Sequence, residues 1–360
     1  MKIIINIGHP ANVHFYKNTI WALEDKGHDI LVTSRAKEIT YELLDIYNIP
    51  YTALTKIYKT GFLGQTVEMI ERDIKLYKLT KKFKPDIITG FASENSAHVS
   101  KVTKASSIIF TDTEHSKFAS IILYPFADVI LTPSCFKKDL GRKQVRFNGY
   151  KELAYLHPNY FKPNPEVLDE LNLSKDDKFI IVRFISWSAT HDIGYKGLNL
   201  DSKIKLVKEM EKYGKVFITS ESKLDKNLEK YKIKVSSEKM HDLLYYATLY
   251  IGEGGTTSTE AAILGTPSIL IDSQAKFCGV HNELMNKYGL QLYYDSDKKD
   301  DAFKKAIEIL ENENSKKEWQ KKREKLLNDK IDVTKFMVDF IENCPESFYE
   351  YQKTKNDAWK

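Results

Sequence analysis

The chain has 360 residues, of which 42% are hydrophobic, so it can bury the cores of two ordinary domains and is not a disordered protein. Lys and Arg number 55 against 50 Asp and Glu, and both kinds of charge are spread along the whole sequence. A net charge of +5 distributed in this way argues against a nucleic-acid-binding protein and is compatible with an anionic small ligand.

The cysteines and the apolar runs exclude further classes of protein. Cys135, Cys278 and Cys344 have neither CxxC spacing nor a partnering His cluster, so neither a zinc site nor a disulfide scaffold is expected. The initial MKIIINIGHP is too short for the core of a signal peptide, and no run approaches the ~20 apolar residues of a membrane-spanning helix. We therefore expect a cytoplasmic protein, with peripheral contact to an anionic membrane surface as an open alternative.

The first 156 residues alternate between apolar strand patterns and helix patterns. Strands are predicted at 2–7, 28–33, 86–89, 107–110 and 128–132, with helices at 13–26, 36–48 and 65–83. Short apolar strands separated by longer helices are typical of a parallel sheet with right-handed crossovers.

A linker and a second alternating region follow. Residues 157–165, HPNYFKPNP, hold three prolines and two asparagines, which disfavours helix and strand alike. Within 166–330, strands are predicted at 178–184, 215–220 and 249–252, and helices at 200–213, 238–247 and from about 301. Residues 315–343 have a charged helical pattern, and the C-terminal segment 331–360 is expected to pack back on the N-terminal domain. The predicted architecture is α/β, with two doubly wound Rossmann-like domains facing a central cleft and ligands at the carboxyl ends of the strands.

The most informative stretch is YIGEGGTTSTEAAILGTPSIL, residues 250–270. Glycines after an apolar strand let the backbone approach a ligand, and the start of the following helix favours an anion such as a diphosphate. The candidate nucleotide-binding residues are Gly254, Gly255, Thr256, Thr257, Ser258 and Glu260, the last of which is placed to accept ribose hydroxyls. A second interpretation stays open, because Thr257 and Glu260 also have the spacing of a capping box.

Two loops in the N-terminal half carry candidate catalytic side chains. In GHPANVHFY, residues 8–16, His14 is a candidate general base, with helix capping or packing on Tyr16 as the structural alternative. In FTDTEHSKF, residues 110–118, acidic residues crowd one loop, where one carboxyl group can acquire a raised pKa. The alternative for Glu114 and its neighbours is a helix cap followed by first-turn acids.

Two further loops are candidates for ligand contact. RFISWSATHDIG, residues 183–194, follows the first strand of the second domain and offers Arg183, Ser186, Ser188 and His191 to a diphosphate or a sugar. TKIYKTGFLGQ, residues 55–65, combines lysines with aromatic residues and could contact an acceptor or a lipid head-group, but an ordinary exposed loop is the favoured interpretation.

Several of these stretches together resemble a known family. GHPANVHFYKN, FTDTEHSKF, PFADVILTPSCF, NGYKELAYLHP, RFISWSATHD, VFITSE and GEGGTTSTEAAILGTPSI occur in the order found in an uncharacterised prokaryotic family, domain of unknown function 354. The similarity covers most of residues 1–290. That family in turn resembles GT-B proteins, which implies a nucleotide-sugar site on the C-terminal domain and an acceptor site on the N-terminal domain.

Two GT-B relatives imply different chemistry. The peptidoglycan N-acetylglucosaminyltransferase is similar at His14, Gly254, Gly255 and Glu260, which implies an inverting, metal-independent sugar transfer with His14 as the base. The non-hydrolysing UDP-N-acetylglucosamine 2-epimerase is similar at the glycine turn and Glu260, and it places functional side chains at Glu114 and His191. The epimerase's arginines are missing here, since its corresponding runs appear only as TDTEHSK and ATHDIG.

The sequence thus predicts a glycosyltransferase that moves a sugar from a nucleotide-sugar donor, UDP-linked on the resemblance, to a hydroxyl acceptor in cell-surface glycan synthesis. The expected partners are the nucleotide sugar and a glycan or lipid-linked acceptor, without a separate cofactor or a metal. The alternatives are a nucleotide-sugar 2-epimerase and a protein that binds a nucleotide or glycan without catalysis.

Overall fold

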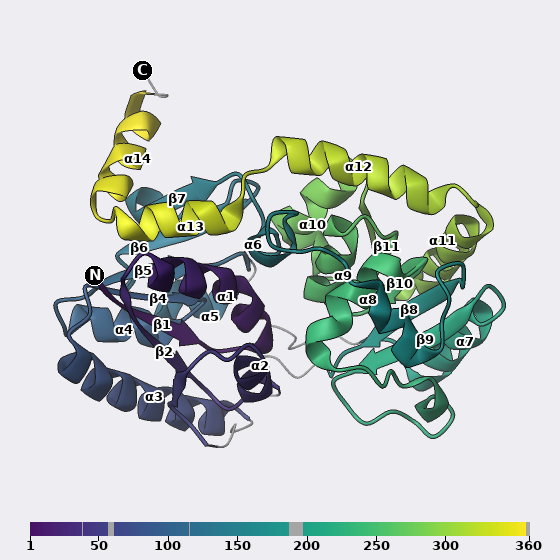
Figure 1. Cartoon of the computed structure of the whole chain (residues 1–360), viewed down its shortest axis with the longest axis horizontal. Coiled ribbons are helices and arrows are strands. Elements are labelled where there is room, and N and C mark those ends of the chain that lie inside the picture. The colour runs from purple at the N-terminus through teal and green to yellow at the C-terminus, as the bar shows by residue number, and fades with distance from the viewer. Residues whose placement is uncertain (38, 57–60, 115, 187–196, 358–360) are drawn as a thin grey trace. The chain divides into compact units, whose positions relative to one another are not determined.

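The computed structural model describes all residues except 38, 57–60, 115, 187–196 and 358–360. The chain divides into two compact units (Figure 1). Unit 1 comprises Met1–Tyr160 and Ile331–Lys360, and unit 2 comprises Phe161–Lys330. The division after Tyr160 lies inside the proline-rich segment 157–165.

Unit 1 is built on a seven-stranded parallel sheet in the order β3-β2-β1-β4-β5-β6-β7. Its strands are β1 (Lys2–Ile7), β2 (Asp29–Ser34), β3 (Tyr51–Ala53), β4 (Ile87–Phe91), β5 (Ser106–Phe110), β6 (Val129–Pro133) and β7 (Gln144–Phe147). The run of isoleucines in β1 is fully buried, as expected for a parallel strand covered on both faces.

Helices cover this sheet and include the C-terminal segment. They are α1 (Pro10–Asp25), α2 (Thr40–Ile46), α3 (Phe62–Phe83), α4 (Glu94–Lys101), α5 (Lys117–Ile122), α6 (Leu153–Leu156), α13 (Val333–Glu342) and α14 (Glu346–Asp357). The helix α13 lies beside α1 (Figure 1), where Thr19 Oγ1 donates to Met337 Sδ at 3.7 Å. Thr334 Oγ1 also donates to the carbonyl of Ala154 at 2.7 Å, which ties α13 to α6.

Unit 2 has a five-stranded parallel sheet in the order β12-β11-β10-β8-β9. Its strands are β8 (Phe179–Phe184), β9 (Lys215–Ser220), β10 (Leu249–Gly252), β11 (Ser268–Ile271) and β12 (Gln291–Tyr294). Its helices are α7 (Leu200–Met210), α8 (Met240–Tyr246), α9 (Gly255–Ile263), α10 (Gly279–Glu283), α11 (Lys299–Glu311) and α12 (Ser315–Asp329).

Several element boundaries differ from the sequence predictions. The helix α1 starts at Pro10, three residues before the predicted start, because proline is favoured at the first helical position. The predicted single helix at 315–343 is two helices, since residues 330–332 separate α12 from α13. The tail after Pro345, which shows no clear pattern in the sequence, contains α14. Among the described residues, none of the helices combines the length and the apolar character needed to cross a membrane.

Candidate functional site

The strand order of unit 2 has a switch point at the carboxyl ends of β8 and β10. From β8 the chain moves to β9 on one side, and it later returns to β10 on the other side. Ligands of doubly wound sheets bind at such a switch point, outside the carboxyl ends of the strands. The glycine-rich turn after β10 lies at this point and leads directly into α9.

Two glycines in this turn are required by its geometry. Gly254 has φ 96°, a conformation that side chains other than glycine rarely adopt. A Cβ on Gly255 would lie 2.8 Å from His281 Nε2, so a larger residue would force one of the two to move. Residues 254–257 are partly exposed, and the N–H groups at the start of a helix point outward along its axis. The start of α9 is therefore suited to an anion.

Glu253 is a buried carboxylate that the sequence analysis missed. Its Oε1 accepts the backbone N–H of Leu198 at 2.6 Å, and its Oε2 accepts the backbone N–H of Ile185 at 3.2 Å. Lys203 Nζ lies 3.8 Å from the same carboxylate, whose side chain is 0% exposed. Glu253 thus fixes both ends of the segment that joins β8 to α7. The predicted residues Ser188 and His191 belong to that segment but lie outside the described residues.

Arg183 and Ser186 share a carboxylate partner beside the turn. Arg183 Nη2 donates to Glu221 Oε1 at 2.9 Å, while the N–H and Oγ of Ser186 contact Glu221 Oε2 at 3.2 and 3.3 Å. The position of a Cβ on Gly254 lies 3.2 Å from Arg183 Nε, so the guanidinium group runs alongside the turn. The charge of Arg183 is matched by Glu221, a partner that the sequence analysis did not identify.

Glu260 lies in the second turn of α9, where its Oε1 is 3.1 Å from His241 Nε2. Both side chains are buried, and His241 comes from α8. The interpretation of Thr257 as the N-cap in a capping box is wrong, because the N-cap of α9 is Gly254 and Thr257 is the third helical residue. Glu260 is therefore held by a histidine of the preceding helix.

The sequence predicts that the Ser258 hydroxyl contacts a ligand, and the structure places this hydroxyl elsewhere. Its hydroxyl is buried and lies 2.8 Å from Ser268 Oγ, and it accepts from Gln291 Nε2 at 2.8 Å. The hydroxyl thus faces the sheet, and the expectation that it contacts a ligand is wrong. The same glutamine accepts from His281 Nδ1 at 2.8 Å, so a buried polar chain leads from the sheet to His281, beside Gly255. Neither Gln291 nor His281 was a sequence candidate.

In unit 1, His14 lies inside α1 and is almost fully buried. Its Nδ1 is 3.1 Å from the Tyr47 hydroxyl, and its ring also packs against Tyr155 at a centroid distance of 5.5 Å. The helix is capped by His9, whose Nδ1 accepts the N–H of Ala11 at 3.1 Å. The alternative in which His14 caps the helix is therefore wrong.

The carboxylates after β5 have separate partners. Glu114 Oε1 accepts the backbone N–H of Lys137 at 3.0 Å and is buried. Asp112 forms an ion pair of 3.1 Å with Lys151, which follows β7 and was not predicted. His115 lies outside the described residues. Asp112 and Glu114 thus each have a contact of their own with the segments that follow β6 and β7.

Unit 1 also contains two arginine–glutamate pairs that the sequence pattern does not predict. Arg35, after β2, donates from Nε and Nη2 to the two oxygens of Glu68 at 2.9 and 3.0 Å. Arg72 Nη2 donates to Glu94 Oε1 at 2.6 Å, at the start of α4. These residues lie far apart in the sequence, and no local motif marks them.

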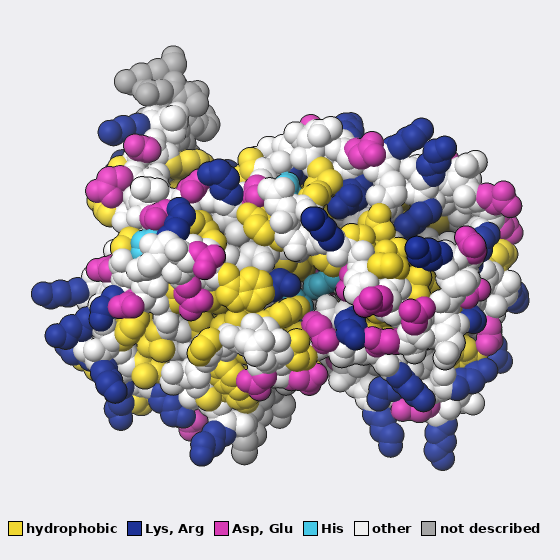
Figure 2. All heavy atoms as spheres, viewed as in Figure 1, with side chains coloured by type: hydrophobic (Ala, Val, Ile, Leu, Met, Phe, Trp, Pro, Cys, Tyr) yellow, Lys and Arg dark blue, Asp and Glu magenta, His cyan; other side chains and the backbone are white. Residues whose placement is uncertain are grey.

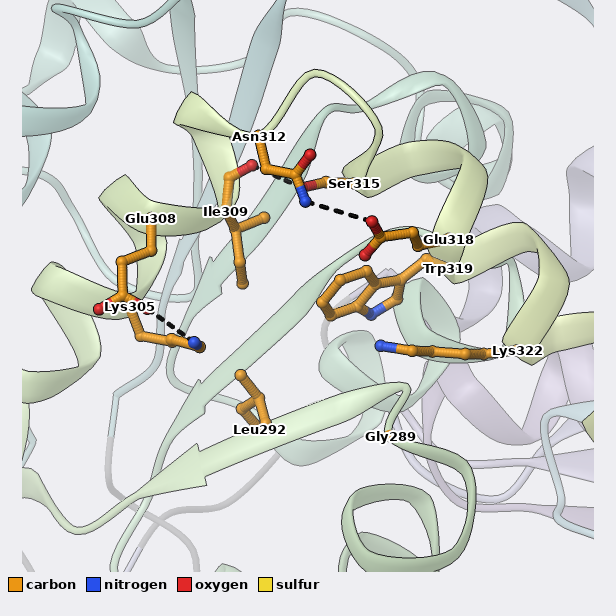
Figure 3. A pocket seen from close by; sticks show the side chains of 10 residues that line it. All are labelled: Gly289, Leu292, Lys305, Glu308, Ile309, Asn312, Ser315, Glu318, Trp319 and Lys322. Atoms are coloured by element: carbon orange, nitrogen blue, oxygen red, sulfur yellow. Dashed lines mark hydrogen bonds and ion pairs between the residues drawn. The ribbon is translucent and has the colours of Figure 1, made fainter.

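A cavity of about 410 Å³ in unit 2 lies away from the switch point. Figure 3 shows Trp319 of α12 in its wall, with Lys322 Nζ 3.6 Å from the ring centroid. Leu292 of β12 and Ile309 of α11 complete its apolar lining. Since Gly289, which precedes β12, also lines it, the cavity is at the amino end of this strand, opposite the edge where doubly wound sheets bind ligands.

Comparisons with known proteins agree with this architecture. A Methanocaldococcus jannaschii protein, the uncharacterized protein MJ0665, is 26% identical over 297 residues, which is 80% of this chain and 86% of that protein. The solved structure of UDP-GlcNAc 2-epimerase from Methanocaldococcus jannaschii in complex with UDP-GlcNAc and UDP superposes with a TM-score of 0.62 at 18% identity, covering 88% of this chain and 94% of that one. SsfS6, a glycosyltransferase from Streptomyces sp. SF2575, gives a TM-score of 0.59 at 12% identity over 95% of this chain and 100% of its own.

These structural matches confirm the predicted α/β class and the GT-B fold, since both parallel sheets are included in the similarity. The sequence resemblance is also confirmed. Residues 1–345 match the family described as "Protein of unknown function (DUF354)", and the chain belongs to that family.

Proposed function

We propose that this protein is an enzyme that transfers a sugar from a nucleotide-sugar donor, UDP-linked, to a hydroxyl group of an acceptor. The observation that carries the proposal is the start of α9, where Gly254 and Gly255 expose a helix N-terminus at the switch point of unit 2. An anion fits there, and the diphosphate of a nucleotide sugar is an anion of suitable size. Of the two similar solved structures described above, one is a UDP-GlcNAc 2-epimerase in complex with UDP-GlcNAc and UDP, and the other is a glycosyltransferase, which supports this class of ligand.

The proposed reaction is a single displacement. The acceptor oxygen forms a bond to the anomeric carbon, the bond from that carbon to the diphosphate oxygen breaks, and the nucleoside diphosphate leaves with the electron pair. The acceptor's proton passes to a base, and the configuration at the anomeric carbon is inverted. The first N–H groups of α9 stabilise the charge that develops on the leaving diphosphate, so the proposal requires no metal ion and no cofactor.

Glu260 is proposed to accept the ribose hydroxyls of the nucleotide. The contact of 3.1 Å between its Oε1 and His241 restricts the orientation of the carboxylate. A carboxylate held in one orientation loses less conformational entropy when it binds a ligand. In this proposal His241 is a positioning residue, because it acts on the ligand through Glu260.

The base is proposed to be His14. Its Nδ1 is engaged by the Tyr47 hydroxyl, and when Nδ1–H donates to that oxygen the proton acceptor of the ring is Nε2. The acceptor molecule is proposed to be a glycan or a lipid-linked sugar of the cell surface, bound by unit 1.

A nucleotide-sugar 2-epimerase is the second candidate, and one observation favours it. Glu114 is a buried carboxylate directly after β5, at the position where the resemblance places an acidic residue of the epimerase. A carboxyl group at this position is the kind of group that an epimerase needs for acid–base work.

Turnover assays with a panel of nucleotide sugars separate these functions. A transferase releases nucleoside diphosphate only when an acceptor hydroxyl is present. An epimerase converts the donor alone and incorporates deuterium from D₂O into the sugar. A binding protein is stabilised by the ligand without either reaction, and that result would contradict the proposed enzyme.

A further inference from the structure

Tyr250 of β10 is a fully buried tyrosine whose hydroxyl reaches the glycine turn that follows this strand. Its Oη donates to the carbonyl of Glu253 at 3.0 Å, and the carbonyl oxygen of Gly254 lies 3.4 Å from the same Oη. Burial raises the pKa of this phenol well above its ordinary value of about 10, so the group remains a hydrogen-bond donor. A phenylalanine would fill the same space but would not supply this donor. The hydroxyl therefore serves the turn and not the packing of the strand.

The backbone of Glu253 is held on both sides of its Cα. Its N–H donates to the carbonyl of Arg183 at 2.9 Å, which continues the pairing of β10 with β8. Gly252 makes this close approach possible, since a Cβ there would lie 2.3 Å from the carbonyl oxygen of Arg183. With the N–H of Glu253 bound to β8 and its carbonyl bound to Tyr250, the peptide plane that leads into Gly254 has a fixed orientation.

This orientation determines where the next two N–H groups point. In a trans peptide, such as those of this turn, the carbonyl and the following N–H point in opposite directions. The carbonyl of Glu253 faces the Tyr250 hydroxyl, so the N–H of Gly254 points away from that hydroxyl. The carbonyl of Gly254 also faces it and accepts the N–H of Ser258 at 3.3 Å, so the N–H of Gly255 points the same way. Successive N–H groups that point to one side form a concave site for an anion.

Side-chain charge alone does not explain why an anion would bind at this turn. Arg183 runs alongside the turn, but its charge is matched by Glu221 at 2.9 Å. Figure 2 shows Lys, Arg, Asp and Glu side chains interspersed over the face of unit 2 that it presents, and Figure 1 gives the position of that unit. The backbone N–H groups are therefore well suited to recognise a phosphate here, and their direction decides how strongly they bind it.

We propose that Tyr250 is a positioning residue of the nucleotide site. Its hydroxyl holds two carbonyls on the core side of the turn, so that the N–H groups of Gly254 and Gly255 are directed at the diphosphate before it binds. Donors that are oriented in advance lose less conformational entropy on binding, which increases the affinity for the phosphates and not for the nucleoside. The inference rests on the proposed function, because that function assigns the diphosphate to this turn.

The test compares UDP with uridine in isothermal titration calorimetry of the full chain. Tyr250→Phe is expected to weaken UDP binding about 3- to 10-fold, the worth of one hydrogen bond, and to leave uridine binding unchanged. Tyr16→Phe is the matched control, because Tyr16 is also fully buried and its hydroxyl lies 3.1 Å from Thr89 Oγ1 in unit 1. This control is expected to change neither affinity. Circular dichroism and thermal melting must show that both variants are folded.

The outcomes distinguish this inference from the proposed function. A wild-type chain that binds UDP no better than uridine contradicts a diphosphate site and overturns both. A wild-type chain that prefers UDP, together with an equal preference in Tyr250→Phe, overturns the positioning role alone. So does an equal loss of UDP and uridine affinity in Tyr250→Phe, which would mean a general distortion of unit 2.

A second measurement uses NMR of protein labelled with ¹⁵N-glycine. In the wild-type chain, UDP is expected to shift the amide proton resonances of Gly254 and Gly255 downfield, because both N–H groups then donate to phosphate oxygens, and uridine is not. The shifts are expected to be smaller in Tyr250→Phe. If neither resonance moves when UDP binds to the wild-type chain, these N–H groups do not hold the diphosphate and the positioning role is wrong.

Discussion

The His241 imidazole and the Glu260 carboxylate meet at 3.1 Å, inside unit 2 and close to the glycine turn. The two residues come from α8 and α9, and both are buried. A buried carboxylate needs hydrogen-bonding partners, and this one has a histidine from the preceding helix. The pair gives the proposed ribose contact a defined orientation.

Glu260→Ala is expected to weaken UDP binding by about 1.5–3 kcal/mol, the worth of hydrogen bonds to a charged group. His241→Ala is expected to have a smaller effect on affinity, because it removes only the orientation of the carboxylate. Isothermal titration calorimetry with UDP measures both. Unchanged affinity in Glu260→Ala, together with a lower melting temperature, would mean that the glutamate serves only the structure.

Gly255→Ala is expected to weaken UDP binding by about tenfold or more. The added methyl group would lie 2.8 Å from His281 Nε2, so either the helix start or the imidazole must move. Combining it with His281→Ala is expected to recover part of the affinity, since the smaller side chain makes room. If the double variant binds UDP no better than Gly255→Ala alone, the added methyl group obstructs UDP directly and not by displacing His281.

Glu253→Gln is expected to destabilise unit 2 by about 1–3 kcal/mol. One of the two carboxylate oxygens that accept the N–H groups of Ile185 and Leu198 becomes an amide donor, which leaves one of these N–H groups without its acceptor. Scanning calorimetry should show a lower transition temperature. Glu313→Gln is the control, because Glu313 is exposed in the same unit. Equal transition temperatures for the two variants would show that Glu253 does not anchor the segment between β8 and α7.

Local sequence patterns predicted the fold, but they could not identify several residues of the candidate site. Consecutive buried isoleucines in β1 and the glycines after β10 are local signals, and they sufficed for the parallel sheets and for the location of the turn. The direction of the Ser258 hydroxyl depends on Gln291, which lies in β12, a strand that the sequence pattern did not reveal. Glu253 likewise acquires its role from backbone groups more than fifty residues away.

The ion pair between His98 and Asp73 predicts a dependence of stability on pH. The hydrogen bond to Asp73 raises the pKa of His98, and the carbonyl of Ile122 accepts from the other ring nitrogen at 2.7 Å. The folded state therefore binds the proton more tightly than the unfolded state. This stabilisation is complete below the ordinary histidine pKa of about 6.5, and it is lost as the pH rises through the higher folded pKa.

Asp73→Asn removes the partner that raises this pKa. In urea denaturation, the loss of unfolding free energy caused by this substitution is expected to be larger at pH 6 than at pH 9. Asp45→Asn, on α2 of the same unit, serves as the control for a change of one charge. A loss that is equal at both pH values would show that the charge of His98 does not contribute to stability.

His14→Ala is expected to lower kcat by ~10²–10⁴-fold if the imidazole is the base. Tyr47→Phe keeps the aromatic packing but removes the hydroxyl that lies 3.1 Å from Nδ1, so a smaller loss of kcat is expected. Steady-state kinetics with a nucleotide sugar and an acceptor measure both variants. An unchanged kcat in a destabilised His14→Ala variant would assign the histidine to the core of unit 1.

The central claim is tested most directly by a crystal structure of the protein with a UDP-sugar. The diphosphate is expected within hydrogen-bonding distance of the backbone N–H groups at the start of α9, with the ribose hydroxyls on Glu260. A nucleotide bound elsewhere in the chain would contradict the account. So would the failure of UDP, GDP, CMP and dTDP ligands alike to bind the protein.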